Sequence, residues 1–248
     1  MLINLSGKKA LVTGGSRGIG RAIAEHLSEA GCDIAINYFR NRKAAEEVAA
    51  GLKKEPLLLT GNVAEEEDIS KIFEEIKKEW GEIDIVVSNA ASGVLKPPQE
   101  LTLHHWHWTL DINSWALISL TNKAIPMMKP GSRIIAISSL GSVRAIPNYT
   151  LVGASKAALE SIVRHLSQEF APNGIHVNAI SAGVVDTDAL KHFPNREELI
   201  QNSIQKTPAR RLTEPKDVAK IALFLCSDLS DMVHGQTIVV DGGYSIVA

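Results

Sequence analysis

The sequence predicts an α/β fold in which helices cover both faces of a doubly wound parallel sheet. Short apolar runs such as residues 134–137 are bounded by glycine or serine, which is typical of strands that are buried on both faces. Stretches with apolar residues at helical spacing, such as residues 65–80, alternate with these runs. Near the N-terminus, one apolar run leads directly into a glycine-rich turn and a helical pattern. Together these observations indicate a single α/β domain over residues 1–248.

The apolar runs predict seven strands, each short enough to be buried in such a sheet. We expect them at residues 9–13, 33–37, 57–59, 83–87, 134–137, 177–180 and 237–240. The helical patterns between them include residues 65–80, 102–129, 150–170 and 215–226. Residues 188–212 have weak periodicity, two prolines and mixed charge, which in a compact domain is more typical of a substrate-binding lid than of a plain connection.

Composition excludes several classes of protein. With 45% hydrophobic residues the chain can bury a large core, and its formal net charge of −2 argues against a nucleic-acid binder, which needs a basic surface. The first ten residues contain Lys8 and Lys9 and no apolar core, so they do not resemble a signal peptide, and no apolar run is long enough to span a membrane. Cys32 and Cys226 have neither disulfide-framework nor zinc-site spacing. We therefore expect a cytoplasmic protein.

Residues 14–20 form a candidate dinucleotide-binding loop, because they follow a strand and precede a helix. Gly14 would allow the tight turn, Gly18 would let the backbone approach a pyrophosphate, and Gly20 would permit close packing of the helix. The spacing is Gly-x-x-x-Gly-x-Gly rather than Gly-x-Gly-x-x-Gly. The alternative, a glycine turn that binds no ligand, is disfavoured by this strand–turn–helix setting.

The residues after the second strand favour NADPH over NADH. This strand ends without the acidic residue that would bind a ribose 2′-hydroxyl. Arg40 follows it, and Arg17 lies in the glycine-rich loop; a guanidinium can bind a 2′-phosphate through two parallel hydrogen bonds. Arg42 and Lys43 also follow, but with nearby glutamates they can equally form a solvated helix face.

Other strand ends are expected to complete the cofactor site. Asn62 and Val63 follow the third strand, where an adenine ring would lie, and small residues follow the fourth strand. Thr187, after the sixth strand, is placed to meet a nicotinamide amide. The residues that we expect to contact the cofactor are Gly14, Ser16, Arg17, Gly18, Ile19, Gly20, Arg40, Asn62, Val63, Asn89, Ala90, Lys156, Gly183 and Thr187.

Tyr149 and Lys156 are the candidate proton-transfer pair. They follow the strand at 134–137, and chemistry in open parallel sheets lies at the carboxyl ends of the strands. Their separation of seven residues is almost two helical turns, which would place both on one helix face. A phenol is a proton donor, and an ammonium group beside it makes donation easier.

The long helical pattern at 102–129 contains His104, His105 and His107, which raise the possibility of a metal site. We expect no metal, because no acidic residue or cysteine lies at ligand spacing. We favour aromatic packing of this stretch, for example at a subunit contact. Asn113 lies deeper in the same pattern, where asparagine is unfavourable in a helix interior. It has either a functional task or a solvent-facing position.

The order of these features resembles the short-chain dehydrogenase/reductase family. The resemblance rests on residues 13–20, Asn89-Ala90-Ala91, Asn113, Ser139 and a Tyr-Lys pair, and it covers essentially the whole chain. It implies a Rossmann fold with strand order 3-2-1-4-5-6-7, a nicotinamide cofactor, and a homotetramer joined through the two long helices. It also implies that Ser139 and Asn113 are catalytic with Tyr149 and Lys156.

One departure from the common family pattern points to a particular reaction. Most members have Tyr-x-x-x-Lys, which would require tyrosine at 152, where this chain has Val152. The spacing Tyr149-(x)6-Lys156 resembles the enoyl-acyl carrier protein reductases of bacterial fatty acid synthesis. Members of the first type have a further tyrosine where this chain has Ser139, so the resemblance is closest to the NADPH-dependent third type.

The expected function is therefore NADPH-dependent reduction of the 2,3 double bond of enoyl thioesters carried on acyl carrier protein or CoA. Hydride would add at C3 while charge develops on the thioester oxygen, so the acid must stand further from the nicotinamide than in ketone reduction; Tyr149 would stabilise and protonate this enolate. A carbonyl reductase of the same family, for example one acting on 3-oxoacyl-acyl carrier protein, is the alternative. A cofactor-binding regulator without turnover is disfavoured, since Tyr149, Lys156, Ser139 and Asn113 are all present.

Overall fold

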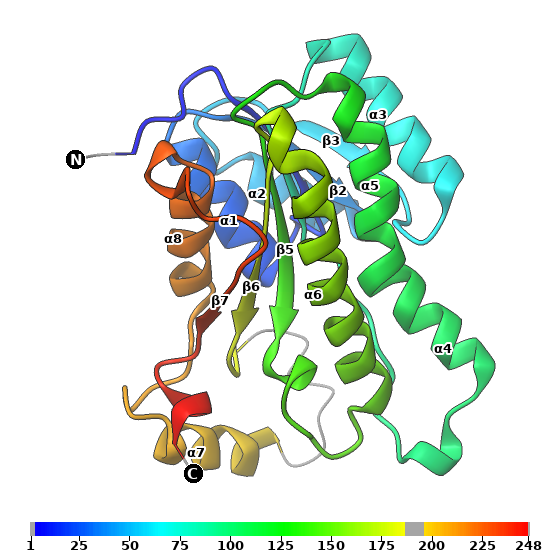
Figure 1. The fold of residues 1–248 in the computed structure, drawn as a ribbon, viewed down its shortest axis with the longest axis vertical. Coiled ribbons are helices and arrows are strands. Elements are labelled where there is room, and N and C mark those ends of the chain that lie inside the picture. The colour runs from blue at the N-terminus through cyan, green and yellow to red at the C-terminus, as the bar shows by residue number, and fades with distance from the viewer. Residues whose placement is uncertain (1–2, 187–195, 248) are drawn as a thin grey trace.

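The computed structural model describes residues 3–186 and 196–247 of the chain. Its centre is a seven-stranded parallel sheet with the order β3-β2-β1-β4-β5-β6-β7, which confirms the predicted order (Figure 1). The strands are β1 Lys9–Thr13, β2 Asp33–Tyr38, β3 Leu57–Thr60, β4 Ile85–Ser88, β5 Arg133–Ser139, β6 His176–Ala182 and β7 Thr237–Val240. The strand order reverses beside β1, so the β1 and β4 ends open a crevice of the kind that binds nucleotides.

Helices cover both faces of the sheet. They are α1 Gly18–Glu29, α2 Arg42–Ala49, α3 Glu66–Trp80, α4 Leu103–Leu110, α5 Ala116–Ala124, α6 Thr150–Phe170, α7 Arg196–Lys206 and α8 Pro215–Leu225. One hydrophobic core lies between the sheet and α1, α2 and α8, and a second lies between the sheet and α3, α5 and α6. Among the described helices, none combines the length and apolar character needed to cross a membrane.

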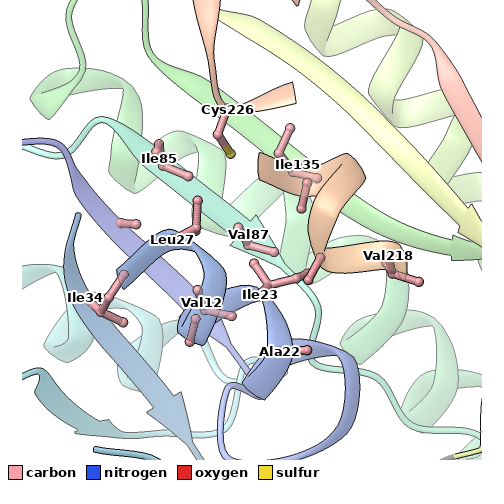
Figure 2. Close-up of a cluster of buried hydrophobic side chains, with 14 of the residues drawn as sticks. Val12, Ala22, Ile23, Leu27, Ile34, Ile85, Val87, Ile135, Val218 and Cys226 are labelled. Carbon is pink, nitrogen blue, oxygen red and sulfur yellow. The ribbon is translucent and has the colours of Figure 1, made fainter. Parts of the chain in front are cut away.

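Successive side chains of a strand point to opposite faces of the sheet, which explains why both faces of the sheet are apolar. Val12 belongs to the core beneath α1, whereas its neighbour Leu11 belongs to the opposite core. In Figure 2, Ile23 and Leu27 of α1 lie beside Val12 and Val87 of the sheet. Because every central strand buries both of its faces, the short apolar runs in the sequence were a reliable signal for strands.

The helical pattern predicted for residues 102–129 is interrupted. A π-helical turn, Asp111–Trp115, separates α4 from α5, and a 3-10 turn, Ile125–Met127, follows α5. π-Turns inside helices are rare and are frequently found at functional sites. The prediction of one uninterrupted helix is therefore wrong, and the interruption contains Asn113.

Candidate active site

A cavity of about 950 Å³ opens at the carboxyl ends of the strands. In Figure 1 this is the end of the sheet to which the arrowheads of β5 and β6 point and beside which α7 lies. Most predicted site residues line this cavity, namely Gly14, Ser16, Arg17, Gly18, Ile19, Arg40, Asn62, Val63, Asn89, Ala90, Ser139, Tyr149, Lys156 and Gly183. Gly20 and Asn113 lie outside the lining, and Thr187 lies outside the described residues. Residues distant in sequence are thus gathered around one space.

The glycine-rich loop has the geometry of an anion cradle. Gly14 and Gly18 have φ angles of 61° and 54°, in the left-handed region that glycine adopts without strain. A Cβ atom on Gly20 would lie 2.4 Å from Asn89 Nδ2 and 2.5 Å from the Gly14 carbonyl oxygen, so only glycine fits there. Gly20 therefore acts through packing of α1 against the loop.

The N-terminus of α1 is suited to a phosphate group. Arg17 is the N-cap residue, and within the described chain no side chain caps this helix end and no acidic residue lies in its first turn. The first backbone N–H groups of a helix carry partial positive charge and attract anions. The loop and helix end fit the pyrophosphate of a dinucleotide.

Asn89 ties the glycine-rich loop to the end of β4. Its Nδ2 donates to the carbonyl oxygens of Thr13 at 2.9 Å and Gly14 at 3.2 Å. Thr13 Oγ1 in turn accepts from the backbone N–H groups of Asn89 and Ala90, at 2.9 and 3.0 Å. The Asn89 side chain thus holds the cavity wall in place, and Ala90 presents its small side chain there.

Arg17 and Arg40 are exposed and line the cavity at the end near β2. The Arg40 guanidinium lies 4.9 Å from the centre of the Phe39 ring, which orients it. Arg42 instead forms an exposed ion pair with Glu46 at 2.8 Å on α2, as the helix-face interpretation expects. Among the described residues that line the cavity, every charged side chain is basic.

Asn62 and Val63 lie at the end of β3 on the same side. The Asn62 backbone N–H donates to Asp68 at 2.9 Å, and its side chain accepts from the Ala64 N–H at 3.2 Å. These hydrogen bonds fix the conformation of the turn that forms this part of the cavity wall. Val63 in this turn is buried. Beside them, Tyr38, Phe39 and Asn41 also line the cavity. These three residues were not predicted to contact the cofactor.

Tyr149 directly precedes α6 as its N-cap residue, and its carbonyl oxygen accepts from the Gly153 N–H at 2.7 Å, whereas Lys156 lies within the helix. Asn148 has a φ of 60°, a left-handed conformation that asparagine tolerates, and it reverses the chain just before the tyrosine. Both Tyr149 and Lys156 nevertheless line the cavity. The phenol and the ammonium group thus face one space from the first two turns of α6.

The Tyr149 hydroxyl lies 3.3 Å from Ser139 Oγ, and Ser139 Oγ also accepts from the Gly141 N–H at 3.1 Å. Burial raises the pKa of the Tyr149 phenol, while the contact with Ser139 lowers it slightly. The net effect keeps the phenol protonated at neutral pH, which is the form that an acid needs. Ser139 is thus in direct contact with the proposed proton donor.

Lys156 is buried, and its Nζ donates to the Ile137 carbonyl oxygen at 2.7 Å. Burial lowers the pKa of this ammonium group to about 8, against an opposing effect of the Glu160 carboxylate. Perturbed titration in a cavity is typical of functional groups. The bond to β5 fixes the ammonium beside the cavity, where a ribose could meet it.

Asn113 is buried in the π-turn, which excludes the solvent-facing alternative. Its Oδ1 accepts from the Ser92 N–H at 2.9 Å, and its Nδ2 donates to the Ser92 carbonyl at 2.8 Å and to Ser155 Oγ at 2.9 Å. Ser155 directly precedes Lys156 on α6. Asn113 therefore joins the loop after β4 to the helix that holds the lysine.

The site includes residues that sequence reasoning missed. Trp108 lines the cavity and donates from Nε1 to Ser92 Oγ at 2.8 Å. Tyr244 and Ser245 line it from the chain end, and Arg144 of the active-site loop donates to the Ser245 carbonyl at 2.5 Å. The helical spacing of Trp108 in the pattern at 102–129 could have indicated which face of the helix it occupies. Nothing in the sequence indicated that the C-terminal segment returns to the cavity.

The histidine cluster on α4 has local roles. His105 Nδ1 accepts from the Thr102 N–H at 3.2 Å as part of a capping box, and His107 lies 3.8 Å from Asp111. In the described ranges, no group of His, Cys, Asp or Glu side chains has the arrangement of a metal site. Trp106, beside them, is half-exposed at 44%.

Replacing Gly141 with alanine is expected to disturb the acid directly. A Cβ atom there would lie 2.4 Å from Tyr149 Cε1, so the ring must move. Overpacking of this kind costs about 1–3 kcal/mol of stability. We expect a lower melting temperature in Gly141→Ala, measured by calorimetry. The loss should largely disappear when Tyr149→Ala is added; an equal loss in both backgrounds would contradict the contact.

Comparisons with known proteins identify the family of this chain. The family model described as "Enoyl-(Acyl carrier protein) reductase" matches residues 14–245. The chain is 38% identical over 244 residues to 1-cyclohexenylcarbonyl-CoA reductase of Streptomyces collinus, covering 96% of this chain and 87% of that protein. It is 36% identical over 256 residues to enoyl-[acyl-carrier-protein] reductase [NADH] FabI of Nostoc sp., covering 99% of each.

A solved structure shows the same architecture. The crystal structure of the Bacillus cereus enoyl-acyl carrier protein reductase with NADP+ and indole naphthyridinone superposes with a TM-score of 0.94 at 32% sequence identity, covering 100% of both chains. By its sequence and its fold, this chain belongs to the enoyl-(acyl carrier protein) reductase family of short-chain dehydrogenase/reductases.

Proposed function

We propose that this protein reduces the 2,3 double bond of enoyl thioesters with NADPH, in fatty acid synthesis of the bacterial type. The position of the phenol carries this proposal: Tyr149 lines the cavity beside Ser139, whereas position 152 holds a valine that is only 7% exposed. A Cβ atom on Gly93 would lie 2.2 Å from Val152 Cγ2, so this valine packs against the chain and leaves no room for a tyrosine ring on that side.

The displaced phenol suits conjugate reduction. A bound nicotinamide cofactor supplies a hydride, which in an enoyl thioester adds at C3. Negative charge then develops on the thioester carbonyl oxygen, three bonds away from the carbon that receives hydride, whereas in a ketone the oxygen is one bond away. Tyr149 donates its proton to this oxygen, and tautomerisation of the enol completes the addition of one hydride and one proton across the double bond. An acid placed for ketone reduction stands too close to the nicotinamide for this role.

The neighbouring residues support the proton donor. Lys156 binds the ribose hydroxyls and, as a cation, favours the phenolate left on Tyr149 after transfer. Ser139 hydrogen-bonds the phenol and can contact the thioester. Asn113 fixes the π-turn against Ser155, so that a relay water can be held near Lys156. The four residues thus act as a unit.

The preference for NADPH rests on charge. The cavity lining near β2 offers Arg17 and Arg40 and, within the described residues, no carboxylate that would repel a 2′-phosphate. The Bacillus cereus relative is bound to NADP+, whereas the Nostoc relative is named as an NADH enzyme. Arg17 and Arg40 of this chain support a preference for NADPH.

The rest of the cavity suits an acyl thioester. Trp108, Ile112 and Ile146 provide an apolar wall. Leu199 and Ser203 of α7 line the opposite side, within the proposed lid at residues 188–212, of which residues 188–195 lie outside the described chain. Gly183 and, at an undescribed position, Thr187 are proposed to contact the nicotinamide. The carrier is acyl carrier protein or CoA, both of which appear in the names of relatives.

The test compares two thioesters. Purified protein is incubated with NADPH and crotonyl thioester, then with acetoacetyl thioester, and NADPH absorbance is followed. We expect consumption with the crotonyl substrate. Consumption with the acetoacetyl substrate alone would support the alternative carbonyl reductase, and none with either would support a cofactor-binding regulator.

We further propose a cytoplasmic homotetramer joined through the α4–α5 region and α6. Leu103 and Trp115 on this surface are 72% and 48% exposed, which is unusual for large apolar side chains and fits a subunit contact. Sedimentation velocity is expected to give the mass of four chains, each of 26.8 kDa. The same measurement on Leu103→Glu should show smaller species; a wild-type monomer would contradict the assembly.

A further inference from the structure

A second buried ionisable group, Glu160, lies behind Lys156. It follows Lys156 by one helical turn on α6, and the two side chains are 8% and 6% exposed. Side chains at this spacing lie on the same face of a helix. Glu160 does not line the cavity in the described structure, so it does not touch cofactor or substrate. The steps proposed above give it no role.

The carboxylate of Glu160 is held in place by the sheet. Ser138 Oγ donates to Glu160 Oε1 at 2.5 Å, and the preceding residue of β5, Ile137, accepts the bond from Lys156 Nζ at 2.7 Å. Lysine and glutamate are therefore both anchored to adjacent residues of one strand. A short hydrogen bond from a hydroxyl stabilises the ionised form of a carboxylate.

A buried carboxylate costs free energy unless a charge compensates it, and the same holds for a buried ammonium. The Glu160 carboxylate is the charge that raises the pKa of Lys156 against the lowering effect of burial. On the described elements that face this part of α6, the phenol of Tyr149 and the hydroxyls of Ser138 and Ser139 are uncharged, and Asp111 of the π-turn, 43% exposed, lies 3.8 Å from His107. Each charge thus offsets the burial of the other.

We propose that Glu160, fixed by Ser138, is a positioning residue that keeps Lys156 protonated and its ammonium group directed at the cavity. The kinetic consequence rests on the proposed function, because it assumes that the Lys156 cation assists proton donation by Tyr149. The effect on Lys156 itself does not depend on which substrate the protein reduces.

The first test measures the lysine directly. Protein labelled with ¹³C at lysine Cε is titrated by NMR without cofactor, and the Lys156 signal is assigned from Lys156→Met. We expect Lys156 to lose its proton about one pH unit lower in Glu160→Gln than in the unmodified protein. Ser138→Ala should give a smaller change in the same direction. An unchanged titration of Lys156 in Glu160→Gln would overturn the proposal.

The matched control is Glu169→Gln, the same chemical change at an exposed position near the end of α6. It should leave the titration of Lys156 unchanged; an equal shift in both variants would show a general charge effect and would overturn the specific role of Glu160. Thermal melting shows whether Glu160→Gln remains folded. If it does not, Ser138→Ala carries the test, and no shift in that variant would count against the proposal.

The second test follows kcat/KM for crotonyl thioester against pH. The Lys156 cation is present below its pKa and is lost above it, so activity should fall on the alkaline side. Glu160→Gln should move this fall to lower pH, while Glu169→Gln should not. If the NMR titration shifts and the pH profile does not, the proposed role of Lys156 in catalysis is wrong and its electrostatic pairing with Glu160 stands.

Discussion

Replacing Tyr149 with phenylalanine is expected to lower kcat for enoyl thioesters by about 10²–10⁴-fold, because the variant lacks the proton that quenches the developing enolate. The ring still fills its place against Gly141, so the cavity keeps its shape. The dissociation constant for NADPH, measured by fluorescence titration, should change by less than about twofold. The hydroxyl contacts Ser139 Oγ at the end of β5, whereas the phosphates of NADPH are expected to bind at the Gly14–Gly20 loop.

Tyr244 provides the matched control, since it is a second tyrosine that lines the same cavity. Tyr244→Phe removes an equivalent hydroxyl and should leave kcat within about threefold of the unmodified protein. Full activity of Tyr149→Phe, or an equal loss in both variants, would show that Tyr149 is not the acid.

The double substitution Arg17→Ala and Arg40→Ala is expected to weaken NADPH binding about 100-fold while leaving NADH binding nearly unchanged. A hydrogen bond to a charged group contributes about 1.5–3 kcal/mol, or roughly tenfold in affinity for each exposed arginine. Only NADPH carries the 2′-phosphate that these guanidinium groups would bind. Isothermal titration calorimetry with each cofactor measures the difference.

Arg42→Ala tests whether any nearby positive charge has the same effect. Arg42 is exposed, follows Arg40 by two residues and pairs with Glu46 outside the cavity lining. Its removal should change both affinities by less than about twofold. Equal weakening of NADPH and NADH in the double variant would mean that neither arginine contacts the 2′-phosphate.

The fold was largely predictable because the sheet is buried on both faces. Every strand appeared as an apolar run, but several boundaries were missed where polar residues extend a strand. Arg133 begins β5 as a buried charge paired with Asp231 at 2.6 Å, and Ser139 ends it. Conversely, Ile83 is buried without belonging to β4, since its N–H donates to the Met127 carbonyl. Hydrophobic residues in the sequence indicate which positions are buried. They do not indicate which positions pair in the sheet, as Arg133, Ser139 and Ile83 show.

The part of the active site that could be predicted is the part whose conformation is set by residues close together in the sequence. The glycine-rich loop is local, so Gly14, Gly18 and Gly20 could be assigned from spacing and the adjoining strand. The π-turn was not predictable, because Asn113 is held by Ser92, which lies 21 residues earlier in the chain.

Long-range partners also determine how the tyrosine and the lysine work. Asn148 has a left-handed backbone directly before Tyr149 at the N-cap of α6, a local conformation that helical periodicity does not reveal. The bond from Ser138 to Glu160 joins residues 22 positions apart and has no sequence motif. The residue types of the site were therefore visible in the sequence, but the contacts that tune them required the fold.

In the proposed reaction, hydride is delivered to C3 of an enoyl thioester while Tyr149 supplies the proton. Its most direct test is to incubate the protein with crotonyl thioester and NADPH deuterated at the transferable position, in ordinary water, and to locate the label in the product by NMR. We expect butyryl thioester with deuterium at C3 and ordinary hydrogen at C2. Deuterium at C2, or a product without deuterium at C3, would show that the hydride is not delivered to C3 and would overturn the proposed mechanism.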